Sequence, residues 1–496
     1  MSNKFKILLV YPNLQMINLL PSNISILAAC LKQKGFDVEL FDTTFYKIEE
    51  KSVDEKRVEI LQLRPFNLSR YGIQYKDTDV YDDFRKKVES YKPDLIAPTI
   101  VDDTLDLTIN LLKTIHDLEI PVCAGGVHTI FAPESSLSHD EIDYVCWGEG
   151  EEALPELCQH LKEGASVEKI QNIWSKSNGK ILRKGMRGLV DLDKLPYNDF
   201  SLFEEKRFFR PMQGKVYRMV PVEIDRGCPY SCKFCAAPYL RKLYKKETGC
   251  NYYRMKSPDR VINEIKHYID KYNAEYIYFN SETFLAMSEE KFDYFAREYI
   301  SEIHIPFWCQ SRVETISDFK ISRLAQMGCD RISIGLEHGN EEFRKKILNK
   351  TFTNVQAIDA FKTIRKYSIP ITVNNMIGFP DETREMVFDT INLNRELYAD
   401  SINAYIFVPY HGTELREIAL KKGYLKKDTR THSLINPTLD MPQLSRKSIE
   451  GLLRTFPLYV KMPKNMYDEI RIAEHFTEEG NAVIAQLAIE YAKKYW

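Results

Sequence analysis

The chain has 496 residues, of which 44% are hydrophobic and 28% are charged, and its formal net charge is −2. This composition is typical of a globular protein with a large core, and the length favours two or three domains over one. The near-neutral charge gives no electrostatic reason to expect nucleic acid or an anionic membrane as a partner.

The N-terminal apolar run Phe5–Tyr11 is too short for a signal sequence and predicts a first strand. No stretch approaches the ~18 apolar residues of a membrane span, so we expect a cytoplasmic protein. In a reducing compartment a disulfide framework is not expected. Six of the ten cysteines lie in apolar segments and are expected in the core: Cys30, Cys123, Cys146, Cys158, Cys309 and Cys329.

Residues 1–165 alternate between strand and helix patterns, which predicts a Rossmann-like, doubly wound parallel α/β sheet. The predicted strands are Lys6–Tyr11, Asp37–Phe41, Asp94–Ile100, Pro121–Ala124 and Tyr144–Trp147, and the predicted helices are Ile24–Lys34, Asp106–Leu118 and Glu151–Lys162. Residues 46–91 are too long for an ordinary connection, and we interpret them as an insertion that contains some helix. Residues 166–215 are polar and predict a linker with a small hairpin.

Residues 216–423 repeat six strand–helix units, which predicts a partial (β/α)6 TIM-like barrel. The predicted strands are Val220–Asp225, Tyr276–Asn280, Phe307–Ser311, Arg331–Leu336, Ile371–Ile377 and Ser401–Val408. Ser288 and Ser317 are expected to cap two of the intervening helices. In such barrels the chemistry sits at the carboxyl ends of the strands. Residues 424–496 are expected to form a mainly helical substrate or lid region, with helices at Ser448–Leu458 and Thr477–Tyr495.

Three cysteines follow the first barrel strand in a C-x3-C-x2-C pattern: Cys228, Cys232 and Cys235. Thiolates suit iron–sulfur clusters or zinc. A structural zinc site needs four ligands, and only Cys250 follows at close spacing. An electron-carrying cubane also takes four thiolates, whereas three would leave one iron open to a substrate.

The segment Arg226–Cys235 resembles the signature of the radical S-adenosylmethionine superfamily. The resemblance implies that the three thiolates hold a 4Fe–4S cluster, whose open iron binds the amino and carboxylate groups of S-adenosylmethionine. One electron then cleaves this molecule to a 5′-deoxyadenosyl radical, which removes a hydrogen atom from the substrate.

The resemblance extends along the barrel and implies further contacts to S-adenosylmethionine, each near the carboxyl end of a predicted strand. These residues are Phe234, Ser281, Glu282, Arg312, Glu337, Ile377 and Gly378. A carboxylate or hydroxyl suits the ammonium of the ligand, and an arginine fork suits its carboxylate. His338 stands where relatives often have serine, and both a substrate contact and a plain loop residue remain open for it.

The N-terminal domain followed by this barrel resembles the cobalamin-binding subfamily through the segments Pro21–Gly35, Ala124–His128 and Trp147–Glu151. The loop after the first strand lacks the glycines of a nicotinamide-binding domain. The expected cobalamin contacts are Asn13, Ser25, Thr99, Asp102, Gly125, Gly126, His128, Gly148, Glu149 and Gly150. Because no D-x-H-x-x-G motif is present, we expect base-off cobalamin without a protein histidine ligand. A domain that kept the fold and lost the cofactor is the alternative.

The leading functional hypothesis is a class B-like C-methyltransferase that moves a methyl group from methylcobalamin to an unactivated carbon. A cobalamin-dependent rearrangement, oxidation or cyclisation without methyl transfer is the alternative, and methylthiotransfer is a third. Methylthiotransferases carry three further cysteines in the N-terminal domain, whereas the cysteines here lie in apolar segments. The expected partners are a small-molecule or natural-product substrate and a flavodoxin- or ferredoxin-type reductant. We expect a monomer and no nucleic acid.

Overall fold

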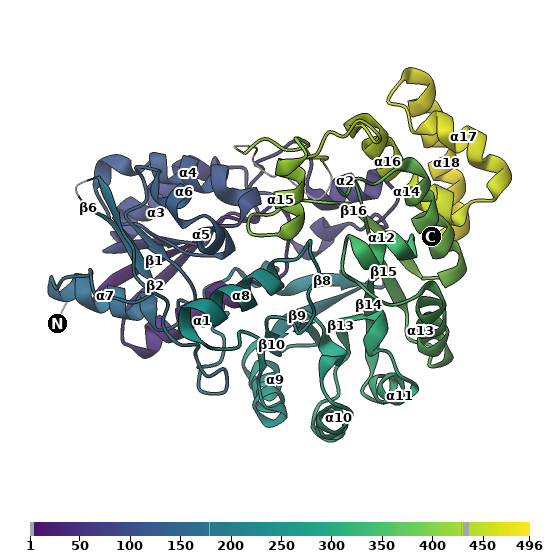
Figure 1. Ribbon diagram of the computed structural model, residues 1–496. Coiled ribbons are helices and arrows are strands. Elements are labelled where there is room, and N and C mark those ends of the chain that lie inside the picture. Colours follow the sequence, from purple (N-terminus) through teal and green to yellow (C-terminus); the bar gives the residue numbers. More distant parts are fainter. Residues whose placement is uncertain (1–3, 178, 428, 430–435) are drawn as a thin grey trace. The chain divides into compact units, whose positions relative to one another are not determined.

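The computed structural model describes residues 4–177, 179–427, 429 and 436–496. They form two compact units, each of which is described by itself (Figure 1). The first unit contains residues up to 53, 67–221 and 240–257, and the second contains the described parts of 54–66, 222–239 and 258–496. This division differs from the expected one, because short segments of each half of the chain pack with the other half.

A parallel sheet forms the centre of the first unit. Its strands are β1 (Lys6–Tyr11), β2 (Asp37–Asp42), β3 (Leu95–Pro98), β4 (Cys123–Ala124) and β5 (Tyr144–Cys146). Strands β2-β1-β3 pair in that order, and the bridges Ile96–Val122 and Thr99–Gly125 join β3 to β4 and then β5. The resulting order, 2-1-3-4-5, is one of the common doubly wound arrangements, and the predicted fold of this domain is confirmed.

Helices cover the sheet of the first unit: α1 (Ser22–Gln33), α3 (Val80–Tyr91), α4 (Leu105–Lys113) and α7 (Ala153–Glu163). Helix α3 lies within the predicted insertion, yet it is the crossover that returns the chain from β2 to β3. Asp79 caps it by accepting from the amides of Tyr81 and Asp82, and the helix buries Phe84 and Val88 in the core.

The predicted linker is largely ordered into the first unit. Strands β6 (Ile173–Ser177) and β7 (Lys180–Leu182) form the expected hairpin, and β6 pairs antiparallel with β5. The segment therefore extends the sheet, because its apolar side chains, such as Trp174, are buried in the same core.

The second unit is built on the curled, open sheet of a partial barrel, in which its strands lie in the order β16-β15-β14-β13-β12. Five strands are parallel: β12 (Tyr276–Asn280), β13 (Phe307–Arg312), β14 (Cys329–Glu337), β15 (Ile371–Ile377) and β16 (Ser401–Ile406). Strand β9 (Lys215–Glu223) carries the chain from the first unit into the second and pairs antiparallel with β8 (Phe209–Met212). The predicted barrel-like fold is confirmed.

Helices follow the parallel strands, and local signals in the sequence start them. They are α9 (Pro258–Tyr272), α10 (Glu289–Glu302), α11 (Asp318–Gln326), α12 (Glu341–Lys346), α13 (Asn354–Lys366), α14 (Arg384–Leu397) and α15 (Glu414–Lys421). Ser288 and Ser317 cap α10 and α11 as expected, by accepting from the amides of Lys291 and Lys320. Because these strands run parallel, the loops that follow them lie at one end of the sheet.

The edge strand β16 is covered by residues that the sequence analysis assigned to the insertion. Helix α2 (Val53–Glu59) brings Arg57 to Asn403, with 2.9 Å between Nη2 and Oδ1. The side chain of Gln62 accepts from the amide of Ala404 at 3.1 Å. These bonds explain why residues 54–66 belong to the second unit.

The C-terminal helices are α16 (Arg446–Lys461), α17 (Tyr467–Ala473) and α18 (Glu478–Tyr495). Helix α16 packs against α14 and β16, and α17 and α18 pack against α16 and against each other. Figure 1 draws α17 and α18 in yellow. The Arg384 guanidinium donates twice to Glu474, at 2.7 and 2.5 Å. Within the described ranges, none of the helices has the length and apolar character needed to cross a membrane.

Candidate active site

The three-cysteine loop of the second unit lies between β10 (Asp225–Arg226) and α8 (Ala236–Thr248), a helix that the sequence analysis did not predict. Gly227 has a φ of +82°, which favours glycine and lets the chain turn into the loop. Cys232 is buried, while Cys228 and Cys235 are half-buried. The sequence therefore presents three thiols on one loop next to the carboxyl ends of parallel strands.

Two of these thiols are held in the protonated form by their surroundings. Burial raises the pKa of Cys235 to about 12 and also raises the pKa of Cys228. Iron binds the thiolate, so metal loading has to displace these protons. The amide of Ala237 lies 3.5 Å from the Cys235 sulfur, and the Thr283 hydroxyl lies 3.6 Å from the Cys228 sulfur.

Arg312, at the end of β13, faces the same loop. Its Nη1 donates to the sulfur of Cys232 at 2.9 Å, and its guanidinium lies 3.9 Å from the ring centroid of Tyr230. Its Nη2 donates to Glu314 at 2.6 Å. A cation against a cysteine sulfur suits an anionic cluster, so the donor set fits a 4Fe–4S cluster held by three thiolates.

Two predicted contacts to S-adenosylmethionine follow β12 and differ in environment. Ser281 is buried and donates to Asp225 at 2.6 Å. Glu282 is exposed. Many protein atoms nevertheless lie near its carboxyl group, and the resulting desolvation raises the pKa of Glu282. Burial raises the pKa of Asp225 to about 7. Glu282 therefore presents a carboxylate at this end of the sheet, whereas Ser281 is engaged inside the protein.

Glu337, the last residue of β14, adopts a backbone conformation that is unusual for a non-glycine residue, with a φ of +67°. The ladder between β14 and β15 shifts register between Gly335 and Glu337. The ammonium of Lys350 is buried here and donates to the Gly335 carbonyl at 2.7 Å and to Glu337 Oε1 at 3.0 Å. Strained residues of this kind concentrate at ligand sites.

The segment after β15 contains the remaining predicted contacts. Ile377 is fully buried, so only its backbone could meet a ligand. Gly378 has a φ of +85°, and an added Cβ would lie 3.3 Å from Ile449 of α16. The ring of Phe234 in the cysteine loop lies 6.1 Å from the ring of Phe379, between centroids. These contacts connect the cysteine loop to the end of β15.

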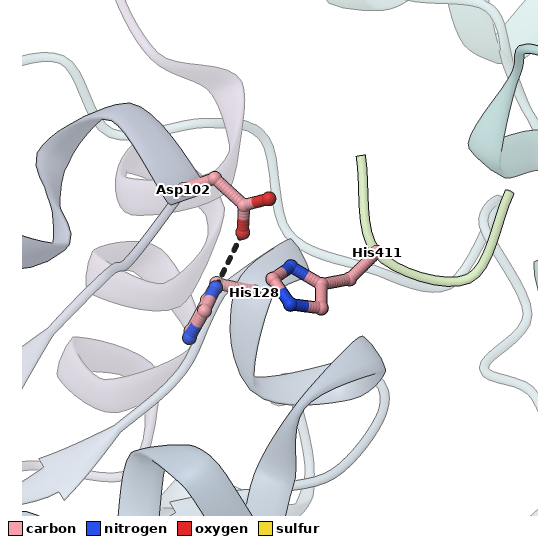
Figure 2. A group of neighbouring side chains, drawn as sticks. All are labelled: Asp102, His128 and His411. Carbon is pink, nitrogen blue, oxygen red and sulfur yellow. Dashed lines mark hydrogen bonds and ion pairs between the residues drawn. The ribbon is translucent and has the colours of Figure 1, made fainter. Parts of the chain in front are cut away.

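In the first unit, Asp102 and His128 lie together where the loops after β3 and β4 meet. Figure 2 shows Nδ1 of His128 bonded to the carboxylate of Asp102; His411, also drawn there, belongs to the second unit. His128 is buried in α5 (Val127–Phe131). Thr99 accepts from Asn23 at 3.1 Å beside the same edge. The carboxyl edge of this sheet thus gathers three of the predicted cobalamin contacts.

Gly125 and Gly126, which follow β4, differ in the space that an added side chain would find. An added Cβ at Gly126, whose φ is +104°, would lie 2.5 Å from the carbonyl oxygen of Ile100. At Gly125 it would meet nothing nearer than Cys146, at 4.0 Å. Protein packing therefore requires Gly126, whereas Gly125 leaves backbone surface that fits the approach of a bulky ligand such as cobalamin.

Two other expected cobalamin contacts bond within the protein. The side-chain nitrogen Nδ2 of Asn13 donates to the Ile17 carbonyl at 2.9 Å and to the Thr44 hydroxyl at 2.8 Å. The Ser25 hydroxyl is fully buried and donates to the Pro21 carbonyl at 2.9 Å. Their side chains brace the loop after β1 and the first turn of α1.

The loop after β5 is likewise held by protein contacts. Gly148 has a φ of +126°, and its added Cβ would lie 2.9 Å from the Tyr244 hydroxyl; at Gly150 it would lie 3.2 Å from Leu27. Glu149 is buried, bonds to Arg254 and accepts from the Val190 amide at 3.1 Å. The glycines of this loop thus accommodate protein atoms, a reason that the sequence pattern alone did not reveal.

Several residues that organise these sites were not expected from the sequence. Asp225, Thr283, Lys350 and Glu382 are all buried polar groups in the second unit. Each of them bonds to a side chain that lies 13 to 56 residues away in the sequence. Thr283, next to Glu282, and Glu382, four residues after Gly378, lie close to predicted contacts, which is the one local signal that the sequence offered.

Two family models match parts of the chain. Residues 222–393 match the model of the radical SAM superfamily, and residues 18–158 match that of the B12 binding domain. An uncharacterized methyltransferase of Pyrococcus horikoshii is 28% identical over 379 residues, which cover 75% of this chain and 80% of that protein.

Two further proteins are similar at lower identity. The anaerobic magnesium-protoporphyrin IX monomethyl ester cyclase of Rubrivivax gelatinosus is 24% identical over 347 residues, which cover 67% of this chain and 60% of that protein. The methyltransferase TsrM of Kitasatospora setae, solved with cobalamin and a 4Fe–4S cluster, aligns with a TM-score of 0.67 and 16% identity over 99% of this chain and all of that one. At this identity the likeness shows the fold.

Proposed function

Since the chain belongs to the radical SAM superfamily and carries a B12-binding domain, we propose that it is a C-methyltransferase acting on an unactivated carbon of a small molecule. The observation that carries the proposal is the three-thiol loop beside the ends of β12 and β13, in a chain whose other unit is a B12-binding fold. The similarity to a methyltransferase over 75% of the chain supports methyl transfer in particular.

When bound, the cluster supplies the electron that splits S-adenosylmethionine into a radical, and cobalamin supplies a carrier for the methyl group. Cys228, Cys232 and Cys235 hold the cluster. The guanidinium of Arg312, which contacts the Cys232 sulfur, balances the negative charge of the cluster. The Thr283 hydroxyl contacts the Cys228 sulfur. The chain contributes orientation and water exclusion, and hydrogen-atom abstraction requires no general base.

S-adenosylmethionine is positioned by the strand ends that face this loop. The Glu282 carboxylate receives its ammonium group, and the strained turn at Glu337 together with the backbone of Ile377 and Gly378 contacts its nucleoside half. The ring of Phe234, in the cysteine loop, packs against Phe379 and closes that side of the site.

Cobalamin is bound at the carboxyl edge of the first unit's sheet, by Thr99, Asp102, Gly125 and His128. The open backbone surface at Gly125 supports this placement. We propose that cobalamin is base-off and that no protein histidine ligates its cobalt, since the D-x-H-x-x-G motif is absent from the sequence.

The test is anaerobic reconstitution with iron, sulfide and cobalamin, followed by measurement of 5′-deoxyadenosine and S-adenosylhomocysteine. Formation of both products supports methyl transfer. Formation of 5′-deoxyadenosine alone would favour a rearrangement, oxidation or cyclisation. The similarity to the magnesium-protoporphyrin IX monomethyl ester cyclase supports this second candidate function.

The cysteine assignment has a matched control in the same chain. Cys232→Ala is expected to abolish the brown chromophore and the cleavage of S-adenosylmethionine. Cys250→Ala is expected to leave both unchanged, because Cys250 follows α8 and bonds to Thr248, outside the loop. Full activity in Cys232→Ala would refute the proposal.

Methylthiotransfer is disfavoured by the cysteines of the first unit. Cys30, Cys123, Cys146 and Cys158 are buried in α1, β4, β5 and α7, and burial raises the pKa of Cys123 and Cys146. Thiols in these positions act as small core side chains.

We further propose that a flavodoxin- or ferredoxin-type protein supplies the electron. We also propose that the enzyme is a monomer, and light scattering would measure its molecular mass.

A further inference from the structure

A buried histidine–glutamate pair joins the ends of β14 and β15 in the second unit. His338 follows β14, and Glu382 lies between the turn after β15 and helix α14. Nε2 of His338 lies 3.0 Å from Oε1 of Glu382. Both side chains are fully buried, with 0% exposure. Neither side chain can touch a ligand, so the structure decides against a substrate contact for His338.

The hydrogen bonds assign the tautomer of this histidine. Nδ1 of His338 accepts from the backbone amide of Asn340 at 3.1 Å, so that nitrogen carries no proton. The proton is therefore on Nε2, which donates to Glu382. The imidazole is neutral and the carboxylate is ionised.

The second carboxylate oxygen of Glu382 holds the turn after β15. Oε2 accepts from the backbone amide of Gly378 and from that of Phe379, the latter at 3.1 Å. A buried carboxylate without such donors would be costly, and here three donors satisfy it. The pair thereby couples the conformation of this turn to the position of His338.

Aromatic contacts extend this coupling to the cysteine loop. The His338 ring stacks on Phe343, with 4.5 Å between centroids, and lies 6.2 Å from Phe379. Phe379 in turn contacts Phe234, which precedes Cys235. His338 itself follows Glu337, the residue with a positive φ.

We infer that His338 and Glu382 are positioning residues for S-adenosylmethionine. They hold the end of β14 and the amides after β15 in the arrangement that receives the nucleoside half of the molecule. The inference rests on the proposed function, since it assumes that S-adenosylmethionine binds at these strand ends. The role requires a donor at the position of Nε2 and an ionised acceptor opposite it.

The experiment measures S-adenosylmethionine affinity directly, by anaerobic equilibrium dialysis against the reconstituted enzyme, with iron content determined in parallel. His338→Leu removes the donor and is expected to weaken binding about tenfold or more. His338→Gln keeps an amide donor near the same place and is expected to stay within about threefold of the wild type. Glu382→Gln turns a donor toward the His338 proton and is expected to weaken binding like His338→Leu.

Asn394→Leu is the control, because it breaks another buried bond of the same unit, the reciprocal pair with Asn375 at 2.8 and 3.1 Å. It is expected to leave the affinity within about twofold. Unchanged affinity in Glu382→Gln, or equal losses in His338→Gln and Glu382→Gln, would overturn the inference, and this pair decides it even where His338→Leu fails to fold. A wild type that binds no S-adenosylmethionine would instead refute the proposed function.

Discussion

The guanidinium of Arg312 donates from Nη1 to the sulfur of Cys232 across 2.9 Å, although 80 residues separate them in the sequence. The same group lies over the ring of Tyr230 and is paired with Glu314. A fixed positive charge next to a ligating sulfur stabilises the more negative, reduced form of a cluster.

The first prediction follows from this contact. Arg312→Met is expected to make the reduction potential of the reconstituted cluster more negative by tens of millivolts, because the cation is lost while the side-chain volume is nearly kept. Arg312→Lys retains the charge and is expected to shift the potential less. An EPR-monitored redox titration measures both, and an unchanged potential in Arg312→Met would contradict the prediction.

A second prediction separates the two glycines of the first unit. Gly125→Ala is expected to leave the thermal stability of the cobalamin-free protein unchanged but to weaken cobalamin binding, because its Cβ would occupy surface left open for the ligand. Gly126→Ala is expected to destabilise the cobalamin-free protein by about 2 kcal/mol or more, since its Cβ would collide with the backbone of Ile100. Thermal melts and absorbance titrations with cobalamin check the two effects separately.

A third prediction concerns the buried cation under Glu337. Lys350→Met is expected to cost about 2–4 kcal/mol of unfolding free energy, because it leaves the Glu337 carboxylate and the Gly335 carbonyl without their donor. The double variant Lys350→Met, Glu337→Gln is expected to recover part of this loss. A double-mutant cycle from urea unfolding gives the coupling, and strictly additive effects would count against it.

The fourth prediction is a pH dependence set by Asp225. Its pKa is about 7 in the folded protein against a model value of 3.8, because the carboxyl group is buried. Stability from this group is full below pH 4, where both states are protonated, and is lost as pH rises toward 7, where only the unfolded state has ionised. The loss amounts to at most about 4 kcal/mol.

Asp225→Asn cannot ionise, so its thermal midpoint is expected to rise relative to that of the wild type as pH increases from 5 to 7.5. Ser281→Ala serves as the companion variant, since it removes the hydroxyl that stabilises the ionised Asp225. Its deficit relative to the wild type is expected to grow above pH 7. Parallel pH profiles for the wild type and Asp225→Asn would refute the assignment.

The periodic parts of the fold were predictable because their signals are local. The predicted bounds of Lys6–Tyr11, Tyr276–Asn280 and Ile371–Ile377 match strands β1, β12 and β15. Helix α8 was missed because no capping residue separates it from the cysteine motif. The crossover role of α3 was missed because its amphipathic pattern lies inside a long polar segment.

By itself, the sequence determined the two-part α/β organisation and the three-cysteine loop, because strand–helix alternation and ligand spacing are properties of neighbouring residues. The tertiary structure alone decided what each polar side chain contacts. Glu149 meets Arg254 across 105 residues and His338 meets Glu382 across 44, so their roles depend on packing that no local pattern encodes. Because these side chains are buried, they form internal hydrogen bonds and ion pairs that hold the binding loops in place.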